Sequence, residues 1–222
     1  MRRHYNEKNP DPSNGGADGL LTGCGAENAS APAQAPQAQK TDAAAPAAGG
    51  KRVLVAYFSR ADENTGGVGY IEKGNTKILA EMIAARTNGD LFEIKPAKAY
   101  PKEYRPATEV AKQEKADNAR PEIVGELPDL SKYDVVFLGY PIWWSDLPMP
   151  VYTFLKKENF AGKTILPFCT HEGSDIGYTP RAIADTTKAD VKDGFELAGH
   201  IAQNSPDEAK TALYAWMEKQ GF

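Results

Sequence analysis

The stretch that decides the fold is DVVFLGYPIWWSDLPMP, residues Asp134–Pro150. The run DVVFLG at its start is apolar and rich in bulky side chains, as in a strand buried on both faces. The proline-rich segment after it predicts a loop, and Pro150 suits the first turn of a helix. A buried strand, a loop and a helix in this order form the repeating unit of a parallel α/β sheet.

The same unit recurs from Lys51 onward. Four more strands are predicted, the last by a weak signal: Arg52–Phe58, Asp90–Ile94, Thr164–Thr170 and Phe195–Ala198. Helical patterns fall between them, around Ile78 up to Asn88–Gly89, over Ala107–Asp117, from Pro150, over Thr179–Lys188, and after a capping box at Ser205–Glu208. This alternation predicts a doubly wound, five-stranded parallel sheet with helices on both faces. Pro167 has no N–H group, so it predicts a bulge or an unpaired amide in the fourth strand.

The first 50 residues differ in composition from the rest. From Gly25 to Gly50 there are eleven alanines in 26 residues, and no aromatic or branched apolar side chain. Such a segment cannot bury enough surface to offset its ordering entropy. We therefore expect residues 1–50 to form a disordered Ala/Pro-rich tail and residues 51–222 to form one domain.

The tail contains a candidate lipidation motif. Leu21–Cys24 resembles the lipobox of bacterial lipoproteins, although Asn6–Gly19 lacks the apolar segment of a signal peptide. Two hypotheses stay open. Either a lipid anchor at Cys24 holds the protein at the bacterial cell envelope, or the motif arose by chance in a cytoplasmic protein.

Composition limits the classes of partner. The net charge is −4 with no basic stripe, so we do not expect nucleic acid as a partner. No apolar run is long enough to span a membrane. The only cysteines are Cys24 and Cys169, too few for a disulfide framework or a zinc site.

The loops after the first, third and fourth strands of such a sheet converge on one crevice. The first loop begins at Ser59–Arg60 and returns at Gly74–Thr76, at a helix N-terminus where free amides and the helix dipole favour a phosphate. The alternative is a simple N-cap. A rival phosphate-binding stretch, Asn64–Gly67, is less suitable because no helical pattern follows it directly.

The other two loops suit a flat ligand. Trp143 and Trp144 could stack on a planar heterocycle or pack on a neighbouring helix or partner chain, and we expect one ring to do each. Gly173, in the third loop, would let the backbone approach such a ring closely. His171 is a proton donor, a solvated loop residue or a hydrogen-bond bridge. A phosphate at the first loop and a flat ring between the other two describe flavin mononucleotide (FMN).

Several motifs together resemble the flavodoxin-like family, in particular its branch with a YPIWW loop. These are LVAYFSR with GNTKILAEMIA, DLFEIKPAKAYP, YDVVFLGYPIWW and ILPFCTHEGS, in this order, over about Arg52–Gly199. The resemblance implies a flavodoxin-like fold that binds FMN non-covalently. The cofactor-binding residues are then Ser59, Arg60, Gly74, Asn75, Thr76, Pro141, Ile142, Trp143, Trp144, Thr170, His171, Glu172, Gly173 and Ser174.

The first loop departs from the family pattern. The usual phosphate loop, S-x-T-G-N-T, is compact, whereas fourteen residues separate Ser59 from Gly74 here. Ala61–Lys73 therefore contains an insertion, and its two ends must meet if the phosphate site is to exist, as in an Ω-loop.

The resemblance implies an electron-transfer protein that shuttles electrons between redox partner proteins. The flavin would do the chemistry, so we expect no catalytic side chain and no metal. One alternative is an FMN-dependent NAD(P)H:quinone or small-acceptor reductase on the same fold, although the chain has no second nucleotide-binding glycine fingerprint. The other is a binding module without flavin.

Overall fold

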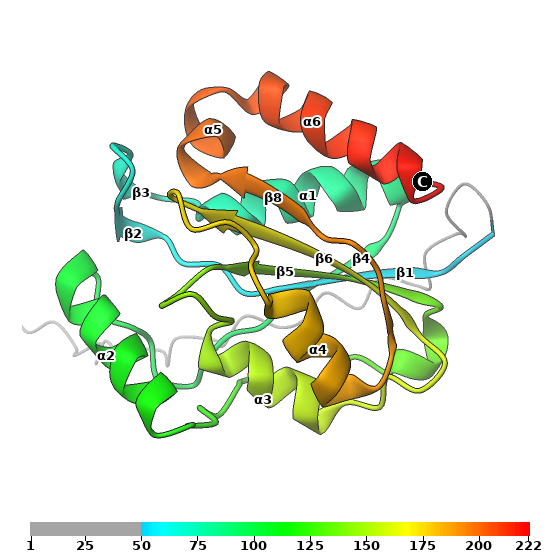
Figure 1. Ribbon diagram of the computed structural model, residues 1–222, viewed down its shortest axis with the longest axis horizontal. Helices are drawn as coiled ribbons and strands as arrows, with labels where there is room; N and C mark the ends of the chain where they lie inside the picture. The colour runs from blue at the N-terminus through cyan, green and yellow to red at the C-terminus, as the bar shows by residue number, and fades with distance from the viewer. Residues whose placement is uncertain (1–49) are drawn as a thin grey trace, which may run out of the picture. The chain divides into compact units, whose positions relative to one another are not determined.

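The computed structural model describes residues 50–222, and the expected tail with its Leu21–Cys24 motif lies outside the described residues. A parallel sheet with strand order β4-β1-β5-β6-β7 runs through the domain, and β8 also pairs with β6 (Figure 1). Its strands are β1 Val53–Tyr57, β4 Asp90–Glu93, β5 Val135–Pro141, β6 Thr164–His171, β7 Asp190–Val191 and β8 Phe195–Ala198. This order confirms the flavodoxin-like sheet.

Helices cover both faces of this sheet (Figure 1). They are α1 Asn75–Thr87, α2 Tyr104–Ala116, α3 Met149–Lys157, α4 Thr179–Thr187, α5 Gly199–Asn204 and α6 Pro206–Lys219, with a short 3-10 turn at Leu130–Lys132. Helices α1, α5 and α6 lie on one face, and α3 and α4 lie on the other. Because both faces are covered, β1 and β5 are almost wholly buried, as their continuous apolar sequences predict.

Pro167 explains why β7 and β8 are two separate short strands beside β6. β7 pairs with Thr164 and Ile165, β8 pairs with Phe168–His171, and the gap between them lies beside Pro167. The Ile165 carbonyl accepts from the Lys192 N–H, so the backbone groups of Ile165 face the side of β6 on which β7 and β8 lie. Residues two apart in a strand direct their backbone groups to the same side. The missing N–H of Pro167 therefore faces the gap between β7 and β8. The expected defect is therefore present, as a break in the neighbouring strand.

The insertion in the first loop forms an antiparallel hairpin of β2 Asp62–Asn64 and β3 Gly69–Ile71. Its turn contains Gly66 and Gly67, both with positive φ. The rival phosphate stretch, Asn64–Gly67, therefore belongs to a hairpin turn and does not begin a helix. At the left-hand end of Figure 1 the hairpin stands beside α2, at the carboxyl ends of the strands.

Three details of the helices differ from the sequence prediction. Ser205 is the N-cap of α6 with Pro206 after it, but its side chain accepts no capping hydrogen bond, so the predicted capping box is wrong. Ser205 also ends α5, a short helix that was not predicted, and its backbone (φ −137°, ψ 59°) serves the junction of both helices. Helix α2 begins at Tyr104, three residues earlier than expected.

Within residues 50–222, no helix has both the length and the hydrophobicity needed to cross a membrane.

Candidate functional site

The two ends of the insertion meet at the N-terminus of α1. A Cβ atom on Gly74 would collide with the Ser59 hydroxyl and the Arg60 carbonyl, so only glycine permits this close approach. The Ser59 Oγ accepts from the backbone N–H of Lys77 at 3.1 Å, and the Gly74 carbonyl accepts from Ile78. Within residues 50–222 this leaves the N–H groups of Asn75 and Thr76 without a partner, in the arrangement that binds anions at helix N-termini.

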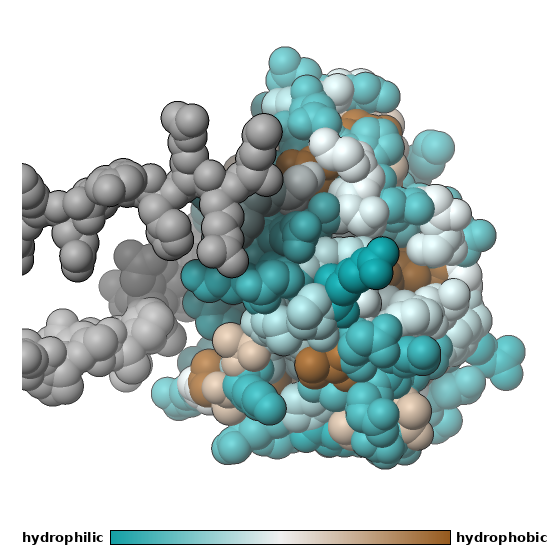
Figure 2. Space-filling model, turned by 90° about the vertical axis from the view of Figure 1, so that its left-hand side faces the viewer, coloured by the Kyte–Doolittle hydropathy of each residue, from teal (hydrophilic) through white to brown (hydrophobic). Residues whose placement is uncertain are grey.

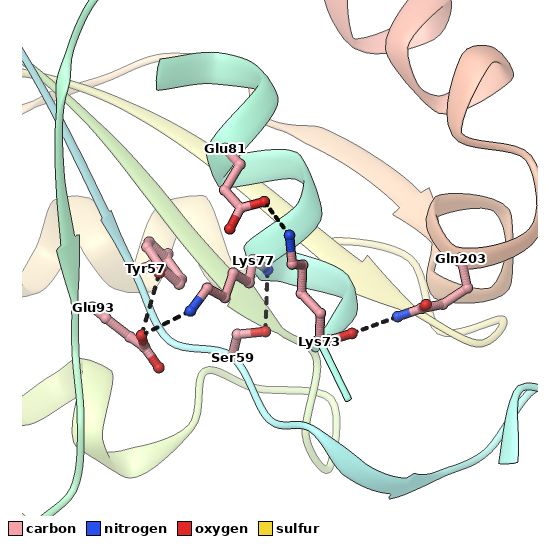
Figure 3. Close-up of polar contacts among 7 residues, drawn as sticks. All are labelled: Tyr57, Ser59, Lys73, Lys77, Glu81, Glu93 and Gln203. Atoms are coloured by element: carbon pink, nitrogen blue, oxygen red, sulfur yellow. Dashed lines mark hydrogen bonds and ion pairs between the residues drawn. The ribbon is translucent and has the colours of Figure 1, made fainter. Parts of the chain in front are cut away.

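Figure 3 shows two lysines beside this loop, neither of which was among the candidate residues. The Lys73 ammonium pairs with Glu81 at 2.6 Å, and the Lys77 ammonium lies 3.4 Å from Glu93. Both ammonium groups are partly exposed, and each is paired with a carboxylate. The sequence signal for Lys77 was its place in Gly74-Asn75-Thr76-Lys77, within the first turn of the helix.

Helix α5 supports the same loop from the opposite side. Gln203 donates from Nε2 to the Lys73 carbonyl at 2.6 Å and to Asn75 Oδ1 at 2.8 Å. Asn75 is thus fixed by a residue 128 positions away, which the sequence did not indicate.

Arg60 has a structural role, because its side chain binds backbone carbonyls. Its guanidinium donates to the carbonyls of Glu63, Pro101 and Lys102 at 2.5, 2.8 and 2.6 Å. These bonds tie the hairpin to the segment before α2. Burial lowers the pKa of Arg60, although the nearby carboxylates of Asp62 and Glu63 oppose that shift. The residue predicted to hold a phosphate therefore has both terminal nitrogens engaged with backbone.

The tryptophans lie in a two-residue turn. Trp143 and Asp146 exchange backbone hydrogen bonds of 2.9 and 3.1 Å, and between them Trp144 and Ser145 have φ values of 52° and 58°. Positive φ at both central positions is the type I′ arrangement, which favours Asn-Gly, so this turn is strained. Strained backbone of this kind is common at ligand sites.

The two indole rings have different surroundings, and one of them is packed against neighbouring side chains, as expected. Trp143 packs edge-on against Phe58 and Tyr100, with ring centroids 5.2 and 4.9 Å away. Trp144 is 46% exposed. Its Nε1 donates to the Thr108 carbonyl of α2 at 2.9 Å, so the exposed ring is held in place.

A buried carboxylate braces the turn. Asp146 accepts from the Leu147 N–H at 2.7 Å and from the Tyr152 hydroxyl at 2.8 Å. Lys115 of α2 lies 3.4 Å from the same carboxylate and donates to the Trp144 carbonyl at 2.6 Å. Because one ammonium joins a buried charge to the strained peptide, helix α2 fixes the position of the turn.

The third loop is held to the first in two places. The Thr76 and Thr170 hydroxyls share a hydrogen bond of 2.8 Å. The Glu172 carboxylate accepts from the backbone N–H of His200 at 2.8 Å, lies 2.7 Å from its Nδ1, and fills the space beside Gly66 of the hairpin. A carboxylate repels phosphate, so Glu172 suits the role of a loop anchor. His200 was not among the predicted site residues.

A hydrogen bond within the third loop holds its remaining residues. Nδ1 of His171 accepts from the Gly173 N–H at 3.0 Å, which is the hydrogen-bond bridge considered for this histidine. Gly173 has a φ of 99°, a conformation open to glycine, and Ser174 is exposed. Pro141 is the last residue of β5, and Ile142 donates its N–H to the Thr170 carbonyl at 2.9 Å, so the second and third loops leave the sheet side by side.

A cavity of about 380 Å³ lies on the α2 side of the tryptophan turn. Its wall consists of Arg60, Asn64, Tyr104, Ala107, Thr108, Ala111, Ile142, Trp143 and Trp144. No residue of Thr170–Ser174 belongs to this wall. Figure 2 looks onto this end of the molecule, where the surface is mostly hydrophilic and hydrophobic residues appear in small separate patches.

The fold and this site define a doubly wound α/β protein with an anion-binding helix N-terminus and an aromatic turn at the carboxyl edge of its sheet. The chain belongs to the flavodoxin family, because the family model for flavodoxin matches residues 52–220.

Solved structures agree with this assignment. A candidate flavoprotein from Bacteroides eggerthii is 30% identical, with a TM-score of 0.58, and the match covers 78% of this chain and 99% of that one. Another from Bacteroides uniformis is 27% identical, with a TM-score of 0.60 and coverage of 76% and 98%. A Lactobacillus acidophilus flavoprotein in complex with FMN shares the fold at 19% identity, with a TM-score of 0.50 and coverage of 69% and 97%. No curated protein matches significantly.

Proposed function

We propose that residues 51–222 bind FMN non-covalently and carry electrons between redox partner proteins. The observation that carries the proposal is the first loop, where Ser59 and the N–H groups of Asn75 and Thr76 surround a helix N-terminus in a chain of the flavodoxin family. Bound FMN would supply the ring that accepts and releases electrons. The side chains then have only to bind it, orient it and exclude water.

Each loop has its own task in this proposal. The amides at the start of α1 and the Ser59 hydroxyl hold the phosphate. Pro141–Trp144 lines one side of the ring and Thr170–Ser174 lines the other. The FMN complex of the L. acidophilus flavoprotein supports the choice of cofactor. The hydrogen bond between Thr76 and Thr170 sets the spacing of the phosphate loop and the third loop.

The absorption spectrum of the purified full-length chain, mixed with FMN and then freed of unbound flavin, tests the proposal. We expect a bound-flavin spectrum and a higher melting temperature with FMN. A colourless protein whose melting temperature ignores FMN would favour the flavin-free binding module.

The same sample separates the electron carrier from an NAD(P)H-dependent reductase. An electron carrier should not consume reduced nicotinamide in repeated turnovers with a small acceptor. Sustained turnover at rates proportional to protein concentration would instead establish the reductase.

We also propose that Cys24 anchors the protein to a membrane through a lipid. The alanine- and proline-rich composition of the 26 residues Gly25–Gly50 suits such a tether. Full-length protein from a bacterial host should then sediment with membranes, and Cys24→Ala should stay in the supernatant. Equal partition of the two would contradict the anchor.

A further inference from the structure

Helix α5 is bonded to the first loop through one side chain, Gln203. Its Nε2 donates to the Lys73 carbonyl at 2.6 Å, a bond drawn in Figure 3, and to Asn75 Oδ1 at 2.8 Å. These two acceptors belong to the residues immediately before and after Gly74, the glycine at which the ends of the insertion meet. Gln203 therefore holds the loop on both sides of its closest approach.

The nitrogen of the Asn75 amide is in contact with the same helix. A Cβ atom on Gly199, the first residue of α5, would lie 2.0 Å from Asn75 Nδ2 and 3.0 Å from Glu172 Oε1. Because Gly199 has no side chain, the Asn75 amide can lie directly against the backbone of α5. The amide is thus bonded through its oxygen to Gln203 and packed through its nitrogen on Gly199.

The residue that α5 holds in this way also carries one of the free amides at the start of α1. Within the described part of the chain, the backbone N–H groups of Asn75 and Thr76 have no partner. A hydrogen bond weakens steeply as its angle departs from linear, so these groups bind an anion well only if their backbone keeps its orientation. Contacts that fix the Asn75 side chain restrict the backbone that carries its N–H. Gln203 has no charge of its own to attract an anion, so its effect has to come through the loop.

We propose that Gln203 is a positioning residue for a phosphate group at the N-terminus of α1, and that it acts through Asn75. The inference rests on the proposed function and deepens it, because it assigns part of the phosphate site to a helix that follows the last strand. Pre-organised amides lose less freedom when a ligand binds, and this difference is the expected source of the effect.

The test is isothermal titration of the full-length protein with FMN and with riboflavin, which has the ring and no phosphate. Gln203→Met keeps the length of the side chain and removes both hydrogen bonds. We expect it to weaken FMN about three- to tenfold and riboflavin less than about twofold, the range for one or two neutral hydrogen bonds. Asn204→Ala changes an exposed neighbour on α5 and is the matched control, with both affinities unchanged.

A second variant displaces Asn75 without removing any hydrogen-bonding group. Gly199→Ala places a methyl group where the Asn75 amide lies, so it should also weaken FMN more than riboflavin. In an Asn75→Ala background the displaced amide is absent, and Gly199→Ala should then cause little further loss of FMN affinity. The loss caused by Gln203→Met should likewise be smaller in that background than in the parent, because residues that act through one another are not additive.

Three results would overturn the inference. Equal losses of FMN and riboflavin in Gln203→Met would mean that the residue only stabilises the fold. Full additivity of Gln203→Met with Asn75→Ala would mean that it does not act through Asn75. Unchanged FMN affinity in both Gln203→Met and Gly199→Ala, in a parent that prefers FMN to riboflavin, would refute this inference and leave the proposed function standing. A parent without that preference would refute both.

Discussion

Thr76 and Thr170 share a hydrogen bond between their hydroxyl oxygens, 2.8 Å apart and 94 residues apart in sequence. Thr76 lies in the first turn of α1 and Thr170 near the end of β6, so this bond joins the proposed phosphate loop to one wall of the proposed ring site. Both residues are almost fully buried, at 1% and 3% exposure. Water therefore cannot replace either partner.

Removing one of these hydroxyls should cost more than removing both. Thr76→Val leaves the Thr170 hydroxyl buried without a partner, which costs about 1–3 kcal/mol, whereas two apolar groups of the same shape pack with little loss. We expect the Thr76→Val/Thr170→Val double variant to be more stable than the sum of the single effects predicts. Urea unfolding measures the coupling, with Thr76→Ser as a control that keeps the hydroxyl. Strict additivity would contradict the buried bond.

Substitution of Trp143 should mainly lower stability, and substitution of Trp144 should mainly weaken ligand binding. Trp143→Ala removes a ring packed on Phe58 and Tyr100, so we expect the free energy of unfolding to fall by about 2–4 kcal/mol, slightly below the range for a fully buried ring. Trp144→Ala should cost little stability, because its ring is 46% exposed, and should weaken FMN several-fold while bound-flavin fluorescence rises. Denaturant unfolding and flavin titration measure both effects. Unchanged flavin affinity and fluorescence in both variants would rule out stacking.

Glu114 should make stability depend on pH. Burial raises the pKa of this carboxyl, although the hydroxyl of Tyr100 donates to it at 2.5 Å and opposes the shift. A folded-state pKa above the unfolded value favours the protonated form in the fold. The contribution of Glu114 is therefore most favourable below the unfolded pKa and is lost as pH rises through the folded pKa.

The test compares Glu114→Gln with the parent protein over a pH series from neutral to mildly acidic. We expect the stability of Glu114→Gln relative to the parent to be highest at neutral pH and to decrease as pH falls through the raised pKa of the carboxyl. Glu109→Gln changes an exposed carboxylate of the same helix and should show no such slope. A slope of opposite sign would contradict the effect of burial.

The sheet could be read from the sequence because its strands are continuous apolar runs, and Phe195–Ala198 was placed to the residue. Two-residue β7 was missed, since Asp190–Val191 is too short to show a pattern. The insertion was visible as extra length between Ser59 and Gly74, but its hairpin form depends on Gly66, Gly67 and the carbonyl contacts of Arg60, which involve distant residues.

The parts of the candidate site that follow strand ends could be predicted from the sequence. The contacts that helices α2 and α5 contribute could not. Ser59 and Gly74 come together as expected, because the end of β1 and the start of α1 meet across the base of the inserted hairpin. The bonds made by Lys115, Gln203 and His200 come from α2 and α5, whose positions are decided by packing. No local sequence pattern carries that information.

Paired titrations with FMN and riboflavin test most directly whether the first loop holds the phosphate of FMN. Hydrogen bonds to a charged group contribute about 1.5–3 kcal/mol each, so the parent protein should bind FMN at least tenfold more tightly than riboflavin. Ser59→Ala should weaken FMN about tenfold or more and leave riboflavin nearly unchanged, because only FMN carries the anion. Equal affinity of the parent for the two ligands, or equal losses of both in Ser59→Ala, would contradict the claim.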